Sequence, residues 1–170
     1  MNRNLLSLFV IFIIAFISLG ITERASVNST SYPGRINIEG TYKFSARKLS
    51  DGTKVKPPHI NGLLVFTEKY RQLNLSWRDN NGKLVSVSCI AEYTIDDIEY
   101  TEKNMFYCVT NETKGSTYDI SDLSASSDVT AKDGTISFIL PTHDKPLITV
   151  NGEHLVIEKP EYTDYWKKVE

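Results

Sequence analysis

The stretch EGTYKFSARKLSDGT, residues 39–53, decides the fold because it has the pattern of one β-strand followed by a tight turn. Apolar and polar side chains alternate along it, with Tyr42, Phe44 and Ala46 on one face and Lys43, Ser45 and Arg47 on the other. Alternation at period two is typical of a strand with one buried and one solvated face. The pair Asp51 and Gly52 then predicts a chain reversal. We therefore expect Tyr42, Phe44 and Ala46 to point toward the inside of a sheet.

The remainder of the chain repeats this pattern, with short apolar runs separated by turn sequences about every ten residues. The turn sequences are Asp51-Gly52, Asn80-Asn81-Gly82, Asp96-Asp97, Asp133-Gly134 and Asn151-Gly152. No long stretch has a helical stripe, and a single helical turn is expected around residues 120–126. Consecutive hairpins favour an antiparallel meander. The expected fold class is therefore all-β, as a sandwich or a barrel.

The N-terminal residues differ from the rest of the chain. An uncharged apolar run over residues 5–21 follows Arg3, and the small residue Gly20 lies near its end. This pattern predicts a secretory signal peptide over residues 1–20. An uncleaved membrane anchor over residues 5–21 is the alternative, because the run is at the lower length limit for spanning a bilayer. In both cases the protein is expected to be exported, either periplasmic or secreted.

Composition limits the organisation and the partners of the remaining chain. Residues 21–35 are rich in Ser, Thr, Pro and Gly without periodicity, which predicts a linker, and residues 36–170 are expected to form one domain. The net charge of −2 offers no field for nucleic acid or anionic lipid. Membrane contact is expected only through an uncleaved N-terminal segment. Sequons at Asn28, Asn74 and Asn111 matter only in a eukaryotic secretory path.

Hairpin registers can be predicted because residues directly opposite each other share a face. Turns at 80–82, 133–134 and 151–152 predict the pairs Trp77 with Val85, Leu75 with Val87, Leu73 with Cys89, Ala131 with Ile136, Val129 with Phe138, Val150 with Glu153 and Ile148 with Leu155. The pairs at the first two turns are all apolar, which supports these registers. At the third turn, the pair next to the turn is mismatched, because it sets apolar Val150 opposite charged Glu153.

The hairpin at Asp96 and Asp97 places two polar residues on the inner face. A two-residue turn there pairs Ile95 with Ile98, Tyr93 with Tyr100, Ala91 with Glu102, Cys89 with Asn104, Val87 with Phe106 and Val85 with Cys108. A buried Glu102 must protonate, find a partner or face a wet cavity. A register shifted by one residue would instead put Glu102 outside and Met105 and Tyr107 inside.

The two cysteines are expected to be free thiols. In the register above, Cys89 lies four residues along the strand from the partner of Cys108, which is about 13 Å at the usual strand rise. A disulfide needs Cα atoms within about 7 Å. Both residues follow the apolar pattern, which predicts buried and unreactive thiols.

Three short motifs resemble the lipocalin-like domain family found in many bacterial proteins. They are Gly40-Thr41-Tyr42 with the turn Asp51-Gly52, the run Gly62-Leu63-Leu64-Val65-Phe66-Thr67, and YTDYWKKV at Tyr162 to Val169, which looks like the family's last strand. Tyr42 replaces the family's usual tryptophan, and Lys167 or Lys168 stands where an arginine is common, so a lysine is expected over the Tyr42 ring. The resemblance implies a calycin-type up-and-down barrel, closed on itself, with room for one small ligand.

The candidate ligand-binding residues are the inward aromatics and two polar residues: Tyr42, Phe44, Trp77, Tyr93, Tyr100, Glu102, Asn104, Phe106 and Phe138. The aromatics would form an apolar wall, and Glu102 and Asn104 would meet the polar end of the ligand. Core filling is the alternative interpretation of the same aromatics. His59, His143 and His154 have no metal-ligand spacing and are expected in loops or on the surface. No nucleophile motif is present, so no metal, cofactor or catalytic residue is predicted.

The function expected is non-catalytic binding of a small apolar or amphipathic ligand in the lumen of the barrel. An alternative is a protein-interaction or inhibitor module with a filled barrel, acting through the loops around His59 and His143. A third hypothesis is an isomerase-type enzyme, in which Glu102 has a pKa raised by burial and acts as general acid or base. If Glu102 lines a ligand site, its replacement by leucine should raise stability and abolish binding.

Overall fold

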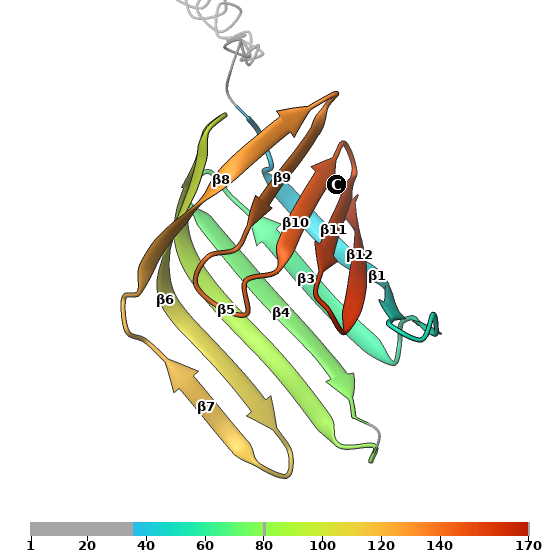
Figure 1. The fold of residues 1–170 in the computed structure, drawn as a ribbon. Helices are drawn as coiled ribbons and strands as arrows, with labels where there is room; N and C mark the ends of the chain where they lie inside the picture. Colours follow the sequence, from blue (N-terminus) through green and yellow to red (C-terminus); the bar gives the residue numbers. More distant parts are fainter. Residues whose placement is uncertain (1–35, 80, 170) are drawn as a thin grey trace, which may run out of the picture. The chain divides into compact units, whose positions relative to one another are not determined.

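A computed structural model describes residues 36–79 and 81–169, which form a β-barrel (Figure 1). Its strands are β1 (Gly40–Leu49), β2 (Lys54–Val55), β3 (Ile60–Phe66), β4 (Tyr70–Arg78), β5 (Leu84–Ile95), β6 (Glu99–Asn111), β7 (Gly115–Asp119), β8 (Ser124–Lys132), β9 (Thr135–Ile139), β10 (Leu147–Asn151), β11 (His154–Glu158) and β12 (Tyr162–Val169). Ten of these close an antiparallel ring, because β12 pairs with β1, while β2 and β7 add to β1 and β6 outside it. The expected all-β, up-and-down closed barrel is confirmed.

The predictions for the N-terminal region lie outside the described residues. These are the signal peptide or anchor, the linker over residues 21–35 and the sequon at Asn28. In the part of the chain that the structure describes, no helix is long and apolar enough to cross a membrane. The helical turn expected around residues 120–126 is wrong, since a loop leads there directly into β8.

Two predicted hairpin registers are confirmed and one is corrected. The pairs at the turns 80–82 and 133–134 are those expected, including Trp77 with Val85 and Val129 with Phe138. At the third turn, Val150 pairs with Leu155 instead of Glu153, and Ile148 pairs with Ile157. The turn lies one residue further along than predicted, which replaces the mismatched pair by an apolar one.

The hairpin between β5 and β6 has a longer turn than predicted. The Asp96 carboxylate accepts hydrogen bonds from the backbone N–H groups of Ile98 and Glu99, both at 2.8 Å, and this organises a four-residue turn. Tyr93 therefore pairs with Glu102 rather than with Tyr100. Because the shift is two residues, it preserves the face of every side chain up to the bulge described next, and Glu102 points inward as expected.

A β-bulge at Met105 reverses the faces in the second half of β6. Ala91 pairs with Asn104 and Ile90 pairs with Phe106, so Met105 is the extra residue. The prediction that Phe106 points inward is wrong, because the bulge turns it outward against the Tyr118 ring, 6.4 Å between centroids. Tyr107 points inward in its place and lines the pocket described below.

A second bulge, at Ser45, has the same effect in β1. Phe44 pairs with Trp166 and Ala46 pairs with Tyr165, so Ser45 is unpaired. The expectation that Ala46 points inward and Arg47 outward is therefore wrong. Arg47 turns into the barrel and is only 6 % exposed.

Gly40 starts β1 with a backbone conformation that favours glycine. Its φ of +145° lies in a region that side chains rarely adopt, and a Cβ at this position would collide with the Lys168 side chain. Lys168 crosses this space and places its Nζ 5.9 Å from the centroid of the Tyr42 ring. The expected lysine over Tyr42 is confirmed, and β12 has the predicted bounds.

Both cysteines are free, as predicted, but for a different reason. Cys89 belongs to the inner face of β5, where it pairs with Tyr107. Cys108 belongs to the outer face of β6, opposite Ser88 and Tyr118. The bulge at Met105 thus puts the two thiols on opposite faces of the sheet, so they cannot form a disulfide.

Candidate functional site

The interior of the barrel has two parts, and the first is filled by aromatic rings. Consecutive rings lie 6.4, 5.4, 5.7 and 4.4 Å apart between centroids in the order Tyr42, Phe66, Tyr93, Tyr100 and Phe138. Each of these residues is at most 4 % exposed. Edge-to-face and stacked rings at such distances pack as a protein core. We call these five residues the aromatic core.

A buried ion pair lies against the aromatic core. Arg71 of β4 donates two hydrogen bonds to the Glu102 carboxylate of β6, at 2.7 and 2.9 Å. The Tyr100 hydroxyl donates a third at 2.6 Å, and the Thr142 hydroxyl donates a fourth. Arg71 also donates to Cys89 Sγ at 3.3 Å. With four donors and no exposed surface, the Glu102 carboxylate is satisfied by the protein itself.

The ionisation of Glu102 follows from these contacts. Burial raises its pKa, but the Arg71 charge and the hydrogen bonds from Arg71, Thr142 and Tyr100 outweigh burial and leave the pKa below its usual value. The expectation of a raised pKa is therefore wrong. The pKa of Tyr100 is well above its usual value, chiefly because the phenol is buried. Glu102 is accordingly an ionised carboxylate in the barrel wall.

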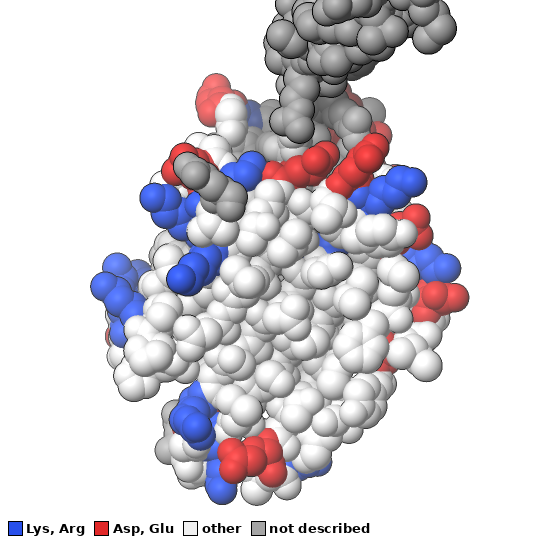
Figure 2. All heavy atoms as spheres, turned by 180° about the vertical axis from the view of Figure 1, so that it is seen from behind, with Lys and Arg blue, Asp and Glu red and all other residues white. Residues whose placement is uncertain are grey.

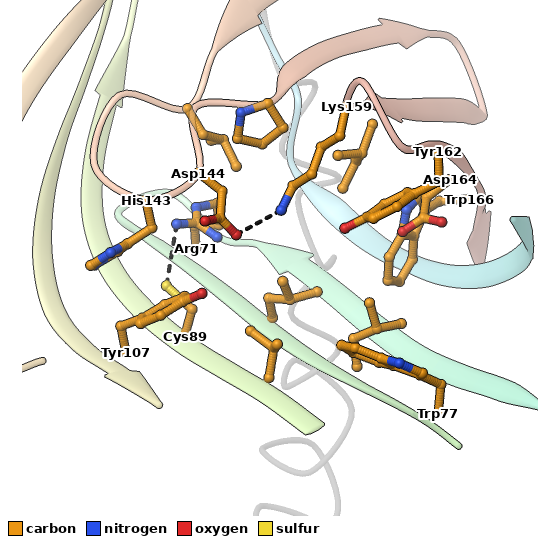
Figure 3. A pocket seen from close by; sticks show the side chains of 16 residues that line it. Arg71, Trp77, Cys89, Tyr107, His143, Asp144, Lys159, Tyr162, Asp164 and Trp166 are labelled. Carbon is orange, nitrogen blue, oxygen red and sulfur yellow. Dashed lines mark hydrogen bonds and ion pairs between the residues drawn. The ribbon is translucent and has the colours of Figure 1, made fainter. Parts of the chain in front are cut away.

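The second part of the interior is an open pocket, which we call the groove (Figure 3). Strands β4, β5 and β6 line it on one side, and the loop between β9 and β10 with strands β11 and β12 lines it on the other. Its volume is about 80 Å³. The lining residues are mostly apolar or aromatic: Arg71, Leu73, Leu75, Trp77, Val87, Cys89, Tyr107, Leu140, His143, Asp144, Pro146, Ile157, Lys159, Tyr162, Asp164 and Trp166.

One wall of the groove is built around Arg47. Its guanidinium donates two hydrogen bonds to the Asp164 carboxylate, at 2.6 and 2.7 Å. It also lies 3.6 Å from the centroid of the Tyr162 ring and 5.3 Å from that of Trp77. Burial raises the pKa of Asp164, and the hydrogen bonds and charge of Arg47 oppose this. The pair fixes the two aromatic rings on the groove wall.

A loop between β9 and β10, residues 140–146, covers part of the groove. The His143 ring stacks on Tyr107 with 4.0 Å between centroids, and its Nε2 lies 3.6 Å from the Asp119 carboxylate. Asp144 accepts a hydrogen bond from Lys159 Nζ at 2.6 Å. Together with the contact of Thr142 to Glu102, these interactions fasten the loop to β6, β7 and the segment that joins β11 to β12.

The nine predicted site residues do not come together in one place. The aromatic core contains Tyr42, Tyr93, Tyr100 and Phe138, with Glu102 beside it. Asn104 is buried, with its Nδ2 3.3 Å from the Asp119 carbonyl oxygen and its Oδ1 without a hydrogen bond within the described chain. Phe44 packs edge-on against Trp166, Phe106 is on the outer face, and Trp77 lines the groove.

Several residues of the site were not predicted, although alternation along a strand points to two of them. Alternation along β4 from Trp77 through Leu75 and Leu73 continues inward to Arg71, the partner of Glu102. Tyr107 points inward in the predicted registers only if the β5–β6 hairpin is shifted by one residue. Alternation along β11 from Leu155 through Ile157 likewise continues to Lys159, and Asp144 belongs to the loop around His143 that was expected to take part in interactions.

The comparisons with known proteins add no assignment. No family model, curated protein or solved structure matches the chain. Residues 36–79 and 81–169 contain no group of three or more His, Cys, Asp or Glu residues arranged to hold a metal ion. His59 and His154 are exposed, and His143 lies at the groove.

Proposed function

We propose that this chain is a non-catalytic, lipocalin-like binding protein that holds a small apolar or amphipathic ligand in the groove. The observation that supports this most is the contrast between the groove and the rest of the interior. Leu73, Trp77 and Tyr107 are only half-buried although they point inward, whereas the aromatic core is closed to solvent. A ligand that covers these side chains removes their apolar surface from water, and this burial contributes favourable free energy to binding.

The size of the groove limits the ligand. Its volume of about 80 Å³ is well below the range of about 300–1,000 Å³ for sites that enclose drug-sized ligands. A slender alkyl chain or a single ring therefore fits better than a bulky polycyclic molecule. The charged residues Asp144 and Lys159 come from loops beside the apolar floor of Leu73 and Leu75, an arrangement suited to an amphipath.

The setting of the proposed function is extracytoplasmic. The uncharged apolar run over residues 5–21, preceded by Arg3, supports export by a signal peptide or retention by an anchor. The motifs at Gly40, Asp51 and Tyr162 support the likeness to lipocalin-like domains, and a closed antiparallel barrel is compatible with it. Exported binding proteins of this kind act where they meet ligands outside the cytoplasm, in the periplasm or beyond the cell.

Native mass spectrometry of the protein recovered from expression of the full chain tests the proposal. We expect an added mass that disappears on denaturation and that is absent from Leu75→Trp, in which the larger side chain fills the groove. Leu63→Trp on the outer face is the matched control and should retain the added mass. A ligand-free mass, with no thermal shift across a panel of lipids and small aromatics, would contradict the proposal.

A protein-interaction module is the second candidate, and one observation favours it. Between Arg78 and Glu92, which lie toward the ends of β4 and β5, the outward residues of β3, β4 and β5 carry no charge: Asn61, Leu63, Val65, Gln72, Asn74, Ser76, Ser86, Ser88 and Ile90. Figure 2 shows the reverse side of the molecule with charged residues gathered mainly at its margins. Such a face avoids the desolvation of charges on association. Leu63→Lys would then abolish binding of a protein partner and leave ligand binding in the groove intact.

A further inference from the structure

We propose that the groove selects ligands with a carboxylate head group, which takes the place of Asp144 as the partner of Lys159. This inference rests on the proposed binding function and adds the chemistry of the ligand. It starts from the ion pair at the rim of the groove, where Lys159 Nζ lies 2.6 Å from the Asp144 carboxylate (Figure 3).

The two members of this pair differ in their access to solvent. The Asp144 side chain is 57 % exposed, whereas the Lys159 side chain is 19 % exposed. Asp144 can therefore turn into water and remain solvated, but Lys159 stays beside the apolar lining and needs an anion. The position of Asp144 is consequently one that an incoming carboxylate can occupy.

Arg71, which also lines the groove, and Arg47, which lies behind the lining residues Tyr162 and Asp164, already have buried carboxylate partners. Arg71 and Arg47 each make two hydrogen bonds to a carboxylate, and those carboxylates, on Glu102 and Asp164, are at most 2 % exposed. Neither acid can be displaced without leaving a buried charge unpaired. Lys159 is thus the lining cation whose partner can leave, and departure of Asp144 gives the site one uncompensated positive charge.

Neighbouring hydroxyl groups strengthen the preference for an anion. Figure 3 shows the Tyr107 and Tyr162 side chains directing their oxygens toward the middle of the pocket, near Lys159. The Tyr107 hydroxyl has no hydrogen-bond partner within residues 36–79 and 81–169, so it is available to donate to a ligand. Burial lowers the pKa of Lys159, but Asp144 and Tyr162 outweigh burial and keep it above the usual value. The lysine therefore remains charged at neutral pH.

The backbone of the loop is consistent with an exchangeable Asp144. Asp144 and Lys145 have φ values of +55° and +45°, a region that non-glycine residues rarely adopt. Two successive residues in this region persist only where the surrounding contacts hold them, and here these include the backbone hydrogen bonds from Lys145 to His143 and from Leu140 to Pro146. The contact with Lys159 is one such contact, so a ligand that replaces it also frees the loop to relax.

The test uses three amphiphiles with the same chain and different heads: dodecanoate, dodecanol and dodecyltrimethylammonium, each below its micelle concentration. Trp77 and Trp166 are the two tryptophans of the sequence and both line the groove, so intrinsic fluorescence of the protein reports occupancy directly. We expect dodecanoate to bind about ten- to a hundredfold more tightly than the other two, as for a hydrogen bond to a charged group.

Two variants and their controls separate the outcomes. Lys159→Gln should remove the preference for dodecanoate, and Asp144→Asn, which removes the competing anion, should tighten dodecanoate binding. Lys167→Gln and Asp128→Asn, at exposed positions of β12 and β8, should change neither. Equal affinity for the three amphiphiles, or no effect of Asp144→Asn, would overturn the carboxylate preference and leave the proposed function standing. Binding of none of the three would contradict both.

Discussion

The aromatic core and the groove belong to one barrel interior but differ in whether solvent reaches their side chains. In the aromatic core, five rings and one ion pair exclude solvent, and the Glu102 carboxylate has four protein donors. In the groove, apolar side chains remain accessible, and Asp144 is a half-exposed partner of Lys159. The comparison indicates that stability resides in the first part and binding in the second.

Three ion pairs of the barrel show this difference in the burial of their two partners. Arg71 with Glu102 and Arg47 with Asp164 are buried on both sides, so the loss of either partner leaves a charge in a low-dielectric setting. Lys159 with Asp144 is buried on one side only. Substitutions should therefore affect stability most in the first two pairs and binding most in the third.

The largest effect is expected for Glu102→Leu. Removing this carboxylate leaves Arg71 buried without its partner, which should lower the free energy of unfolding by about 3–5 kcal/mol. This reverses the expectation from the sequence, which had no partner for Glu102. Urea denaturation measures the effect, and Glu92→Gln on the outer face of β5 is the control that should leave stability unchanged. A stable Glu102→Leu variant would show that the ion pair does not hold the barrel together.

A smaller effect is expected for a matched pair of tyrosines, one in each part. Tyr100→Phe removes a hydrogen bond to buried Glu102 and should cost about 1–3 kcal/mol of stability. Tyr107→Phe removes a hydroxyl without a protein partner in the described chain, so it should leave stability unchanged and weaken dodecanoate binding. Thermal denaturation and fluorescence titration of both variants provide the measurement. Equal loss of stability in the two would remove the distinction between the parts.

The smallest expected effect is a pH dependence carried by Glu102. Its pKa is lower in the folded protein than in the unfolded chain, so its contribution to stability is present above about pH 4.5 and is lost as the pH falls through the folded value. The stability difference between the protein and Glu102→Gln should therefore shrink on acidification. Urea denaturation at a series of pH values measures this difference. A difference that grows toward low pH would contradict the lowered pKa.

The strand order and two hairpin registers could be predicted because turn residues and alternation specify them. Asn80 to Gly82 and Asp133 to Gly134 fix the turn length, and the apolar pairs that follow confirm the register. The bulges at Ser45 and Met105 could not be predicted, because a bulge leaves the composition of a strand unchanged while reversing the faces beyond it.

The candidate site was harder to predict than the fold, and the two bulges explain much of this. The bulge at Ser45 brings Arg47 into the barrel, and the bulge at Met105 does the same for Tyr107. The groove also needs Asp144 and Lys159, which belong to two different loops and are 15 residues apart in the sequence. Arg71 and Lys159 could have been predicted, since alternation along β4 and β11 already places them on the inner face.

Methyl NMR during titration with dodecanoate tests the division between core and groove most directly. Leu73, Leu75 and Ile157 line the groove, whereas Leu64 and Ile148 are buried in the core and do not line it. We predict that the first three methyl signals shift with ligand concentration and that the other two stay in place. Shifts at Leu64 and Ile148 with none at Leu75 would contradict the account, because the ligand would then occupy the part described as filled.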